Sequence, residues 1–410
     1  MSVLGQIARR NRAGEALGLP SWCTAHKETL AAILQTYRDD DAPVLIEATC
    51  NQVNQFGGYT GMTPADFRAF VEKLADGAGV GGGRIVFGGD HLGPNPFTRE
   101  PAVAAMDKAC RMVADYVAAG FSKIHLDASM ACADDAALDD FTRADRAARL
   151  CAAAEGAAGG RRLDYVIGTE VPMPGGETSA EAKVAVTRPE AVAAMVEMHR
   201  EAFARHGVGG AFERVVAAVV QPGVDFSNAS VLEFAPEQAA GLSESLENLP
   251  GLVFEAHSTD YQSEDALRAL VRAGFAILKV GPELTFAFRQ AALALEGIER
   301  ELRVAEPSNL RKALEAAMDA EPGHWKPYVA VGEGRLFGLS DRVRYYWSVP
   351  AVRAALGRLF ANLDGADIPA GLWAQAGFGA VESVPQRPGA ALVGQAVGAV
   401  VRRYRRASGQ

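Results

Sequence analysis

Cysteine is scarce in this sequence, with five residues among 410 and no two of them spaced as CxxC. An odd number of scattered thiols argues against a disulfide-stapled secreted scaffold and indicates reduced cysteines in a cytoplasmic protein. The first 20 residues lack the apolar core of a signal peptide. No window holds about 18 uninterrupted apolar residues, so we expect no membrane span and no membrane partner.

Positive charge is also limited, because 41 Lys and Arg stand against 50 Asp and Glu. This balance argues against a surface that tracks the phosphates of a nucleic acid. The chain contains neither a GxxxxGK[ST] loop nor a protein-kinase residue set, and its Gly-rich segment 79–84 opens no helix. We therefore expect no nucleic-acid partner and no nucleotide cofactor, whereas a phosphorylated small molecule needs only a few local donors.

What the sequence does contain is a regular alternation of short apolar runs with longer amphipathic or Ala-rich segments. Strand runs that are nearly continuous in apolar residues indicate a parallel sheet buried on both faces. The runs predict strands over 21–25, 44–48, 84–88, 123–127, 165–170, 215–220, 252–256 and 276–280. The segments between them predict helices, among them 27–38, 64–76, 99–119, 189–206, 264–273 and 284–304.

Eight such units favour a closed (β/α)8 TIM barrel over a doubly wound open sheet, which usually carries a Gly-rich dinucleotide turn. We expect the barrel over residues 1–304. Beyond them the alternation stops and aromatic residues cluster, which predicts a helical C-terminal extension over 305–410, packed on the barrel. The role of four residues in the extension stays open: they could anchor a phosphate, cover the barrel mouth or only pack the extension. These residues are Arg342, Arg344, Tyr345 and Tyr346.

Polar residues collect where the predicted strands end, which in a barrel is the rim that carries the chemistry. Two of them are imidazoles, His91 after the third strand and His257 after the seventh, and Glu170 ends the fifth strand. Two imidazoles and a carboxylate suit a divalent cation with an open position, and Gln221 after the sixth strand is a candidate fourth ligand. We expect Zn²⁺ first, with Mn²⁺, Co²⁺ or Ni²⁺ as alternatives. For any one of these histidines, the competing interpretation is a structural hydrogen bond.

Carboxylates beside these ligands are candidates for proton transfer. The predicted catalytic residues are Asp90, Asp127 and Glu170, and the alternative for Asp90 is a turn or cap. His125 lies deeper in its strand, so we expect it to support the site or to pack in the core. The predicted substrate-binding residues share a place at or just after a strand end: His26, Asn51, Gln52, Gln55, Ser129, Gly223, Ser258, Thr259 and Gly281.

Several segments resemble the class II, metal-dependent aldolases. SWCTAHKETLAAIL is similar to their first strand and helix, GGDHLGPN to their catalytic Asp and metal-binding His, and KIHLDAS to their fourth strand. IGTEVPMPGGE, EAHST and LKVGPEL resemble their later metal-binding and substrate-binding segments. One departure concerns the ligand set, because those aldolases place a further metal-binding His after strand six, where this chain has Gln221.

A closer resemblance covers almost the whole chain. The segments LIEATCNQVNQFGGYTGMTPADFR, GGDHLGPN, GFSKIHLDASM and DRVRYYW are similar to the non-catalytic, Z-type subunit family of tagatose-bisphosphate aldolase. Relatives in that family act as tagatose 6-phosphate 4-epimerases, and some members carry a tagatose 6-phosphate kinase label. We do not expect kinase activity here, because the chain has no nucleotide loop.

The resemblance and the predicted metal site together imply a divalent-metal-dependent C4 epimerase. It would convert tagatose 6-phosphate to fructose 6-phosphate by retro-aldol and aldol steps, with a phosphorylated ketohexose as its ligand. The alternative is a non-catalytic subunit that stabilises a class II tagatose-1,6-bisphosphate aldolase, whose catalytic subunit would then be its partner. A homo-oligomer is compatible with both.

Overall fold

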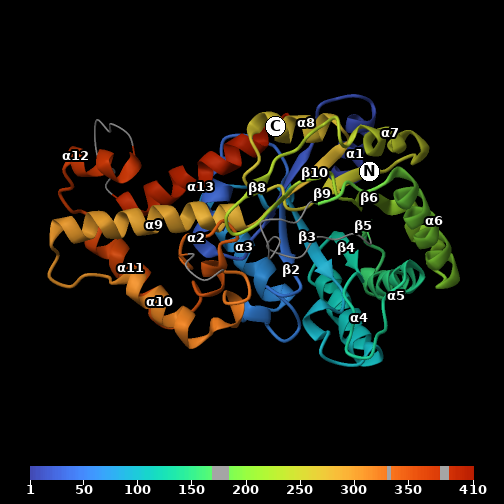
Figure 1. The fold of residues 1–410 in the computed structure, drawn as a ribbon, viewed down its shortest axis with the longest axis horizontal. Coiled ribbons are helices and arrows are strands. Elements are labelled where there is room, and N and C mark those ends of the chain that lie inside the picture. Colours follow the sequence, from blue (N-terminus) through green and yellow to red (C-terminus); the bar gives the residue numbers. More distant parts are fainter. Residues whose placement is uncertain (169–183, 330–333, 379–386) are drawn as a thin grey trace.

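The computed structural model describes residues 1–168, 184–329, 334–378 and 387–410, and its centre is a closed barrel of eight parallel strands (Figure 1). Around the barrel the strands run in the order β1, β2, β3, β4, β5, β6, β9 and β10, and β10 pairs back to β1. Their bounds are β1 (Leu19–Cys23), β2 (Val44–Thr49), β3 (Ile85–Leu92), β4 (Lys123–Asp127), β5 (Asp164–Gly168), β6 (Val215–Val219), β9 (Val253–Ala256) and β10 (Phe275–Val280). Each predicted strand overlaps one of these, and the predicted barrel is confirmed.

Helices cover the outside of the barrel between successive strands. Their bounds are α2 (Lys27–Thr36), α3 (Pro64–Ala78), α4 (Ala102–Ala118), α5 (Asp140–Ala158), α6 (Pro189–Arg205), α7 (Ala240–Ser245), α8 (Glu264–Arg272) and α9 (Pro282–Leu302). Six of them overlap predicted helices, whereas α5 and α7 were not among the predicted ranges. A small hairpin of β7 (Asp225–Phe226) and β8 (Val231–Leu232) lies between β6 and α7.

The start of α3 shows how local chemistry sets a boundary that the sequence predicts well. Thr63 accepts a hydrogen bond at its side-chain oxygen from the Asp66 N–H (3.3 Å). The Asp66 carboxylate in turn accepts one from the Thr63 N–H (3.0 Å). This capping box, with Pro64 at the first helical position, satisfies donors that a helix start otherwise leaves free.

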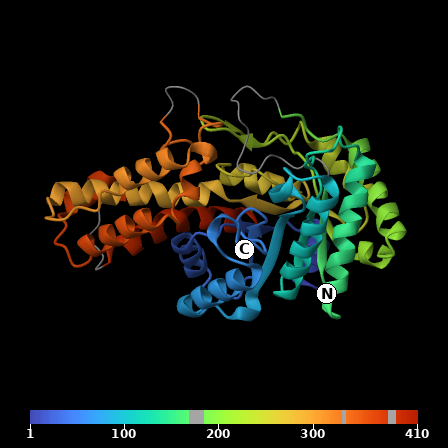
Figure 2. The ribbon, with the colours of Figure 1, turned by 90° about the horizontal axis from the view of Figure 1, so that it is seen from below.

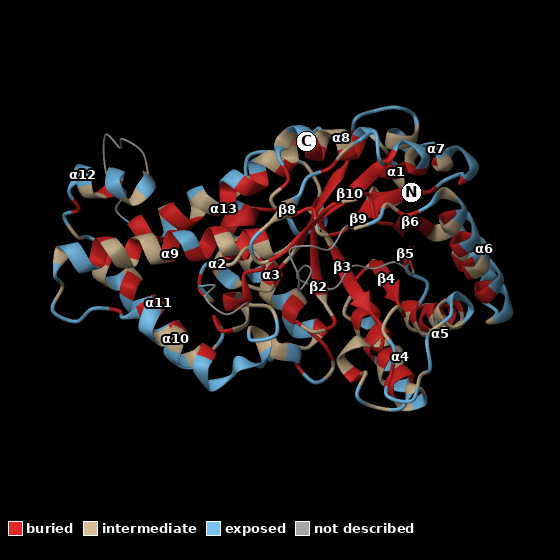
Figure 3. Cartoon of the chain, in the orientation of Figure 1, coloured by how far each residue is buried: buried red, intermediate tan, exposed pale blue. Residues whose placement is uncertain are grey.

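The N-terminal end of the barrel is closed by α1 (Val3–Arg12). Leu4 and Ile7 of this helix are buried in one apolar cluster with Leu19, Leu45 and Ile277 from the barrel strands. The lower part of the barrel is therefore a packed hydrophobic layer. Figure 3 shows the strands buried and the surrounding helices exposing their outer faces.

The C-terminal part of the chain projects to one side of the barrel and then returns to it (Figure 2). The outer helices are α10 (Leu310–Ala320), α11 (Pro350–Leu363) and α12 (Ala370–Trp373), and α10 and α11 pack against the long α9. The last helix, α13 (Pro388–Ala407), runs back along α9 and packs against α2 and α8. Short 3-10 or π turns lie at 58–60, 82–84, 95–97, 209–214, 246–248, 322–324, 342–345 and 374–378. Among the described helices, none is both long and apolar enough to cross a membrane.

The contact of α13 with the barrel centres on Tyr404, which is completely buried. Its hydroxyl donates a hydrogen bond to the backbone oxygen of Thr259 (2.6 Å), and its ring meets Trp22 edge-on, with centroids 5.8 Å apart. The final helix thus packs directly on β1 and on the segment that follows β9.

We predict that Tyr404→Phe lowers the free energy of unfolding by about 1 kcal/mol, because only the hydroxyl is lost. Tyr404→Ala lowers it by about 3–5 kcal/mol, because a cavity opens at the barrel wall. Urea unfolding followed by circular dichroism measures both, with the exposed Val103→Ala on α4 as the control. Equal, small effects for both variants would show that α13 contributes little to the stability of the barrel.

Candidate active site

The end of β3 carries two site residues on an irregular stretch of strand. The strand runs to Leu92 instead of ending at residue 88, so Asp90 and His91 lie within it. The pairing with β4 shifts register between Gly89 and Leu92, and His91 has a φ of 49°. A bulge lets two consecutive side chains turn the same way. Both Asp90 and His91 accordingly line one cavity.

Regular strand alternation places the other site residues. His125 and Asp127 are two residues apart on β4 and share a face, as do Glu255 on β9 and His257 just after it. All four side chains are buried. The ring centroids of His91 and His257 are 5.0 Å apart, and His125 lies 5.3 Å from each of them. Three imidazoles from three separate strands therefore meet in the upper part of the barrel.

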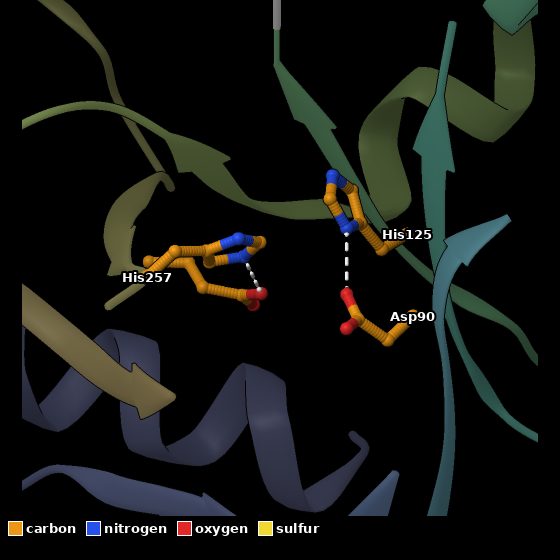
Figure 4. A group of neighbouring side chains, drawn as sticks. Asp90, His125 and His257 are labelled. Carbon is orange, nitrogen blue, oxygen red and sulfur yellow. Dashed lines mark hydrogen bonds and ion pairs between the residues drawn. The ribbon is translucent and has the colours of Figure 1, made fainter. Parts of the chain in front are cut away.

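Each of the three imidazoles has one ring nitrogen held by a carboxylate, and two of these contacts are drawn in Figure 4. The pairs are His91 Nδ1 with Asp127 Oδ2 (2.8 Å), His125 Nδ1 with Asp90 Oδ1 (3.1 Å) and His257 Nε2 with Glu255 Oε1 (2.9 Å). Ser129 supports the first pair, because its hydroxyl donates to Asp127 Oδ1 (2.6 Å). A carboxylate behind each imidazole fixes the orientation of the ring. The other nitrogen of His91, Nε2, lies 3.5 Å from Asp90 Oδ2.

The second nitrogen of His125 is the clearest sign of a ligand. Its Nε2 is buried and has no hydrogen-bond partner among the described residues. Asp90, His125, Glu255 and His257 each offer a ligand atom, and these four atoms lie within 4.8 Å of one another. A buried polar nitrogen without a partner costs free energy, and a metal ion is one group that satisfies it.

A chain of buried charges lies beneath the imidazoles. Lys123 on β4 pairs with Glu47 on β2 and with Glu255 (2.7 Å). Lys279 on β10 pairs with the other oxygen of Glu47 (3.0 Å) and with Asp90. Because these side chains are nearly or fully inaccessible, each charge depends on its partners for stabilisation.

The charge chain decides the protonation of the site. Burial acts to raise the pKa of Asp90, but His91 and Lys279 outweigh it and hold that pKa well below its usual range. Burial, followed by the charge of Lys279, lowers the pKa of His257 to about 3, although Glu255 acts in the opposite direction. At neutral pH Asp90 is therefore an ionised carboxylate and His257 a neutral imidazole, the forms that accept a proton and bind a metal.

A cavity of about 530 Å³ opens onto this group. The predicted site residues that line it are His26, Asn51, Gln52, Asp90, His91, His257, Ser258 and Gly281. His26 directly precedes α2; its Nδ1 lies 2.9 Å from the Thr29 hydroxyl, and its ring is edge-on to Phe288. Residues from five separate segments of the sequence thus line one cavity.

Four predicted residues have structural contacts away from the described cavity lining. Gln55 donates to the backbone oxygen of Lys108 (3.0 Å), and Thr259 donates to that of Lys279 (2.6 Å). The Gln221 side-chain oxygen accepts from the N–H of Gly223 (2.8 Å) and that of Val224 (3.0 Å). Gln55, Gln221, Gly223 and Thr259 are therefore not among the residues that line the described cavity, and their binding and ligand roles stay predictions.

Two further predicted residues lie beside the imidazoles but are not among the residues that line the cavity. Asp127 and Ser129 are next to the imidazoles but behind His91, so they hold that ring instead of facing the cavity. Glu170 lies outside the described residues.

Several site residues were not predicted as such. His125 was expected only as support, and the four residues of the charge chain, Glu47, Lys123, Glu255 and Lys279, were not predicted as site residues. The signal for them is a charged residue in an apolar strand run at an even spacing from a polar strand end. Glu255 is two residues before His257, and Lys123 is four residues before Asp127. Period-two alternation assigns such a residue to the same interior face.

The C-terminal extension also reaches the cavity. Arg344, Tyr345 and Trp347 line it, whereas Arg342 stacks on the ring of Tyr328, with its guanidinium carbon 3.3 Å from the centroid. Tyr346 is buried, and its hydroxyl donates to the backbone oxygen of Glu321 (2.5 Å). The residues whose role the sequence leaves open thus divide into two that face the cavity and two that pack.

Comparison with known proteins gives consistent matches along nearly the full chain. Residues 4–409 match the model of the D-tagatose-1,6-bisphosphate aldolase subunit GatZ/KbaZ-like family. A Klebsiella pneumoniae protein named D-tagatose-1,6-bisphosphate aldolase subunit GatZ is 51% identical over 379 residues, which cover 90% of this chain and 89% of that protein. An Agrobacterium fabrum protein named D-tagatose 6-phosphate 4-epimerase is 50% identical over 378 residues, with 90% and 89% covered.

A solved structure is similar over the same extent. It is described as a probable tagatose 6 phosphate kinase from Sinorhizobium meliloti 1021, with 47% identity and a TM-score of 0.85. The match covers 95% of this chain and all of that one.

The cavity also contains a carboxyl group with a raised pKa, and this predicts a pH effect on stability. Burial raises the pKa of Asp260 to about 7. The backbone N–H groups of Gly281 and Glu283, which donate hydrogen bonds to its carboxylate, act in the opposite direction. The unfolded value is about 3.9. Between these values the folded state binds the extra proton, so Asp260 makes the free energy of unfolding fall as pH rises from about 4 to about 7.

We predict that Asp260→Asn, which keeps an oxygen acceptor for both N–H groups, stabilises the protein, and that the gain in the free energy of unfolding is larger at pH 8 than at pH 5. The gain grows by up to about 1.4 kcal/mol per pH unit across the window. Urea unfolding at both pH values measures it, with Asp265→Asn on the surface of α8 as the matched control. The same stability difference at pH 5 and pH 8 would contradict the raised pKa.

Proposed function

The chain belongs to the D-tagatose-1,6-bisphosphate aldolase subunit GatZ/KbaZ-like family, and we propose that it is a divalent-metal-dependent C4 epimerase of a ketohexose phosphate. The substrate we propose is tagatose 6-phosphate and the product fructose 6-phosphate. The observation that carries this proposal is the group of three carboxylate-held imidazoles beside an ionised Asp90, at the wall of a cavity of about 530 Å³. The epimerase name of the Agrobacterium relative supports the same reaction.

Three properties of the residues fit a metal ion. With metal–nitrogen bonds of about 2.0–2.1 Å, imidazoles on one tetrahedral ion have ring centroids roughly 5 Å apart, and the observed separations are 5.0 and 5.3 Å. The His125 Nε2 atom has no partner among the described residues. The buried group contains four carboxylates and two ammonium groups. The carboxylates belong to Glu47, Asp90, Asp127 and Glu255, and the ammonium groups to Lys123 and Lys279. Imidazole binds a metal in its neutral form, and in that form a divalent cation balances the two excess negative charges.

We therefore propose His91, His125 and His257 as the metal-holding residues, with Zn²⁺ as the first candidate ion and Mn²⁺, Co²⁺ or Ni²⁺ as alternatives. Glu170 stays a proposed ligand and catalytic group from the sequence. When bound, a divalent cation acts as a Lewis acid for the C2 carbonyl of a ketose. We propose His125 as a ligand instead of Gln221, because the side-chain oxygen of Gln221 accepts hydrogen bonds from two backbone N–H groups.

The route to epimerisation follows from the acidity of the substrate. The proton on C4 is not adjacent to the C2 carbonyl, so direct removal of that proton is unfavourable. Breaking the C3–C4 bond avoids it: a base takes the C4 hydroxyl proton, the carbonyl forms at C4, and the C3–C4 electron pair passes to C3 as an enediolate. Rotation of the aldehyde presents its other face, and the bond re-forms as the proton returns to the oxygen.

Asp90 is the residue we propose as that base. Its carboxylate lines the cavity and is ionised, and His125 and Lys279 hold it in place. We propose that Asp127 positions a ligand: its carboxylate contacts Nδ1 of His91 and so orients that ring. The walls of the cavity keep the aldehyde beside the enediolate while it rotates, because loss of either fragment would end the reaction as a cleavage.

A second function is favoured by the name of the Klebsiella relative, an aldolase subunit. In that case the chain stabilises a class II aldolase catalytic subunit, and its own cavity is not used for chemistry. The two functions separate cleanly in an assay of the pure protein. No conversion of tagatose 6-phosphate with any of the four metals, together with stimulation of a co-expressed aldolase catalytic subunit, would favour the subunit function.

We predict that the purified protein retains a divalent metal and that His91→Gln, His125→Gln and His257→Gln each remove it. Asp127→Asn, which weakens the support of His91, lowers metal affinity by about 10–100-fold. Chelator competition with metal analysis measures these values, and circular dichroism checks the fold. His206→Gln, at the surface pair with Asp145, is the control and keeps the metal. Full retention in the His125 variant would remove that residue from the ligand set.

We predict that the wild-type protein converts tagatose 6-phosphate to fructose 6-phosphate without ATP, and that Asp90→Asn lowers kcat by roughly 10²–10⁴-fold. The variant keeps an amide of the same shape but weakens the support of His125, so the rate is measured at a metal concentration that saturates the site, with the metal content checked. A coupled assay for fructose 6-phosphate follows the rate. Asp145→Asn on α5 is the matched control. An Asp90→Asn enzyme within twofold of the wild-type rate would exclude Asp90 as the base.

A further inference from the structure

The cavity has four cationic residues in its wall, and their surroundings differ. Lys279 pairs with Glu47 and Asp90 at the barrel end of the cavity. Lys27 and Arg353 also line the cavity, but both are exposed residues, so water stabilises their charge. Arg344 is the fourth, and it comes from the C-terminal extension.

Arg344 is held rigidly by neutral groups. One terminal nitrogen of its guanidinium donates to the backbone oxygens of Ser340 and Asp341 (3.0 Å to the latter). The other donates to the Tyr345 hydroxyl (3.0 Å), and the guanidinium lies against the Tyr345 ring. Among the described residues, no carboxylate lies within 4.0 Å of Arg344. Its charge is fixed in position and lacks an acidic partner there.

The carboxylate that acts electrostatically on Arg344, that of Asp341, already has other partners. Asp341 pairs with Arg289 (2.8 Å) and accepts a hydrogen bond from Thr285 (2.5 Å). A second guanidinium adds to the positive potential: burial first, and then the charge of Arg344, lowers the pKa of Arg342 to about 10. An anion at this wall would stabilise Arg344 and relieve that repulsion.

We propose that Arg344 binds the phosphate group of the ketohexose phosphate, so that the C-terminal extension supplies the phosphate site of a cavity whose reactive groups belong to the barrel. The inference rests on the proposed function for the identity of the sugar. Guanidinium has a planar fork of donors that matches phosphate oxygens. A phosphate dianion is disfavoured next to the Asp90 carboxylate, so the phosphate of the substrate would bind at Arg344 and not beside Asp90.

Tyrosine and tryptophan rings complete this wall. The Tyr345 ring meets Tyr59 edge-on, with centroids 4.9 Å apart, and Trp347 packs against His26 (5.8 Å between centroids). Tyr59 belongs to the barrel side and Tyr345 to the extension. Contacts across this seam hold Arg344 over the cavity, which explains why the extension belongs to the site.

The test compares a phosphorylated and an unphosphorylated sugar on one set of variants. Arg344→Met removes the charge and the donors but keeps the length of the side chain, and Arg344→Lys keeps the charge but loses the fork. Arg358→Met, on the exposed face of α11, is the matched control. For each protein, the KM and kcat of epimerisation are measured with tagatose 6-phosphate and with tagatose, and binding of both sugars is measured by calorimetry.

We predict that Arg344→Met raises the KM and the dissociation constant for tagatose 6-phosphate roughly 10–100-fold and leaves both values for tagatose unchanged. Arg344→Lys recovers part of the loss, and Arg358→Met has no effect. Equal losses for the two sugars, or no loss for tagatose 6-phosphate, would overturn the assignment. The calorimetric values decide the role of Arg344 even if the protein turns over neither sugar, a result that would count against the epimerase alone.

Discussion

The site depends on a line of buried ion pairs that crosses the interior of the barrel. Lys123 stands between Glu47 and Glu255, and Lys279 stands between Glu47 and Asp90. A buried charge that loses its partner is strongly destabilising, so each member fixes the position of the next. The strands β2, β3, β4, β9 and β10 are thereby held in one arrangement at the level of the imidazoles.

This arrangement orients the reactive groups without direct contact with a substrate. Glu255 is held by Lys123 and in turn holds His257, while Asp90 is held by Lys279 and holds His125. Positioning a ring through a carboxylate is a general way to tune a metal site. The apolar layer below, closed by α1, keeps water away from the charges, and the extension with Arg344 and Tyr345 completes the cavity on its open side.

Most of the fold could be predicted from the sequence because barrel strands buried on both faces are short, continuous apolar runs. The eight strands were found in this way, and the predicted helix start at residue 64 coincides with the capping box of Thr63 and Asp66. The rim position of Asp90, His91 and His257 was also predictable, since chemistry in this fold lies at the strand ends.

The remaining site residues depended on geometry that a linear pattern does not carry. His125 was read as support because it precedes the strand end, yet the bulge at His91 brings the two rings together. Gln55 and Thr259 look like binding residues in the sequence, but in the structure their side chains donate hydrogen bonds to backbone carbonyl oxygens. The part of the extension that reaches the cavity could not be located, because no local signal separates Arg344 from Arg342.

The central claim is that three imidazoles on separate strands hold one divalent ion. X-ray absorption at the zinc edge of the zinc-loaded protein tests it most directly, because imidazole ligands give a characteristic outer-shell scattering. The account predicts a shell of nitrogen and oxygen neighbours at about 2.0–2.1 Å with the signature of several imidazoles. A spectrum without imidazole scattering, or a protein that retains no zinc, would contradict it.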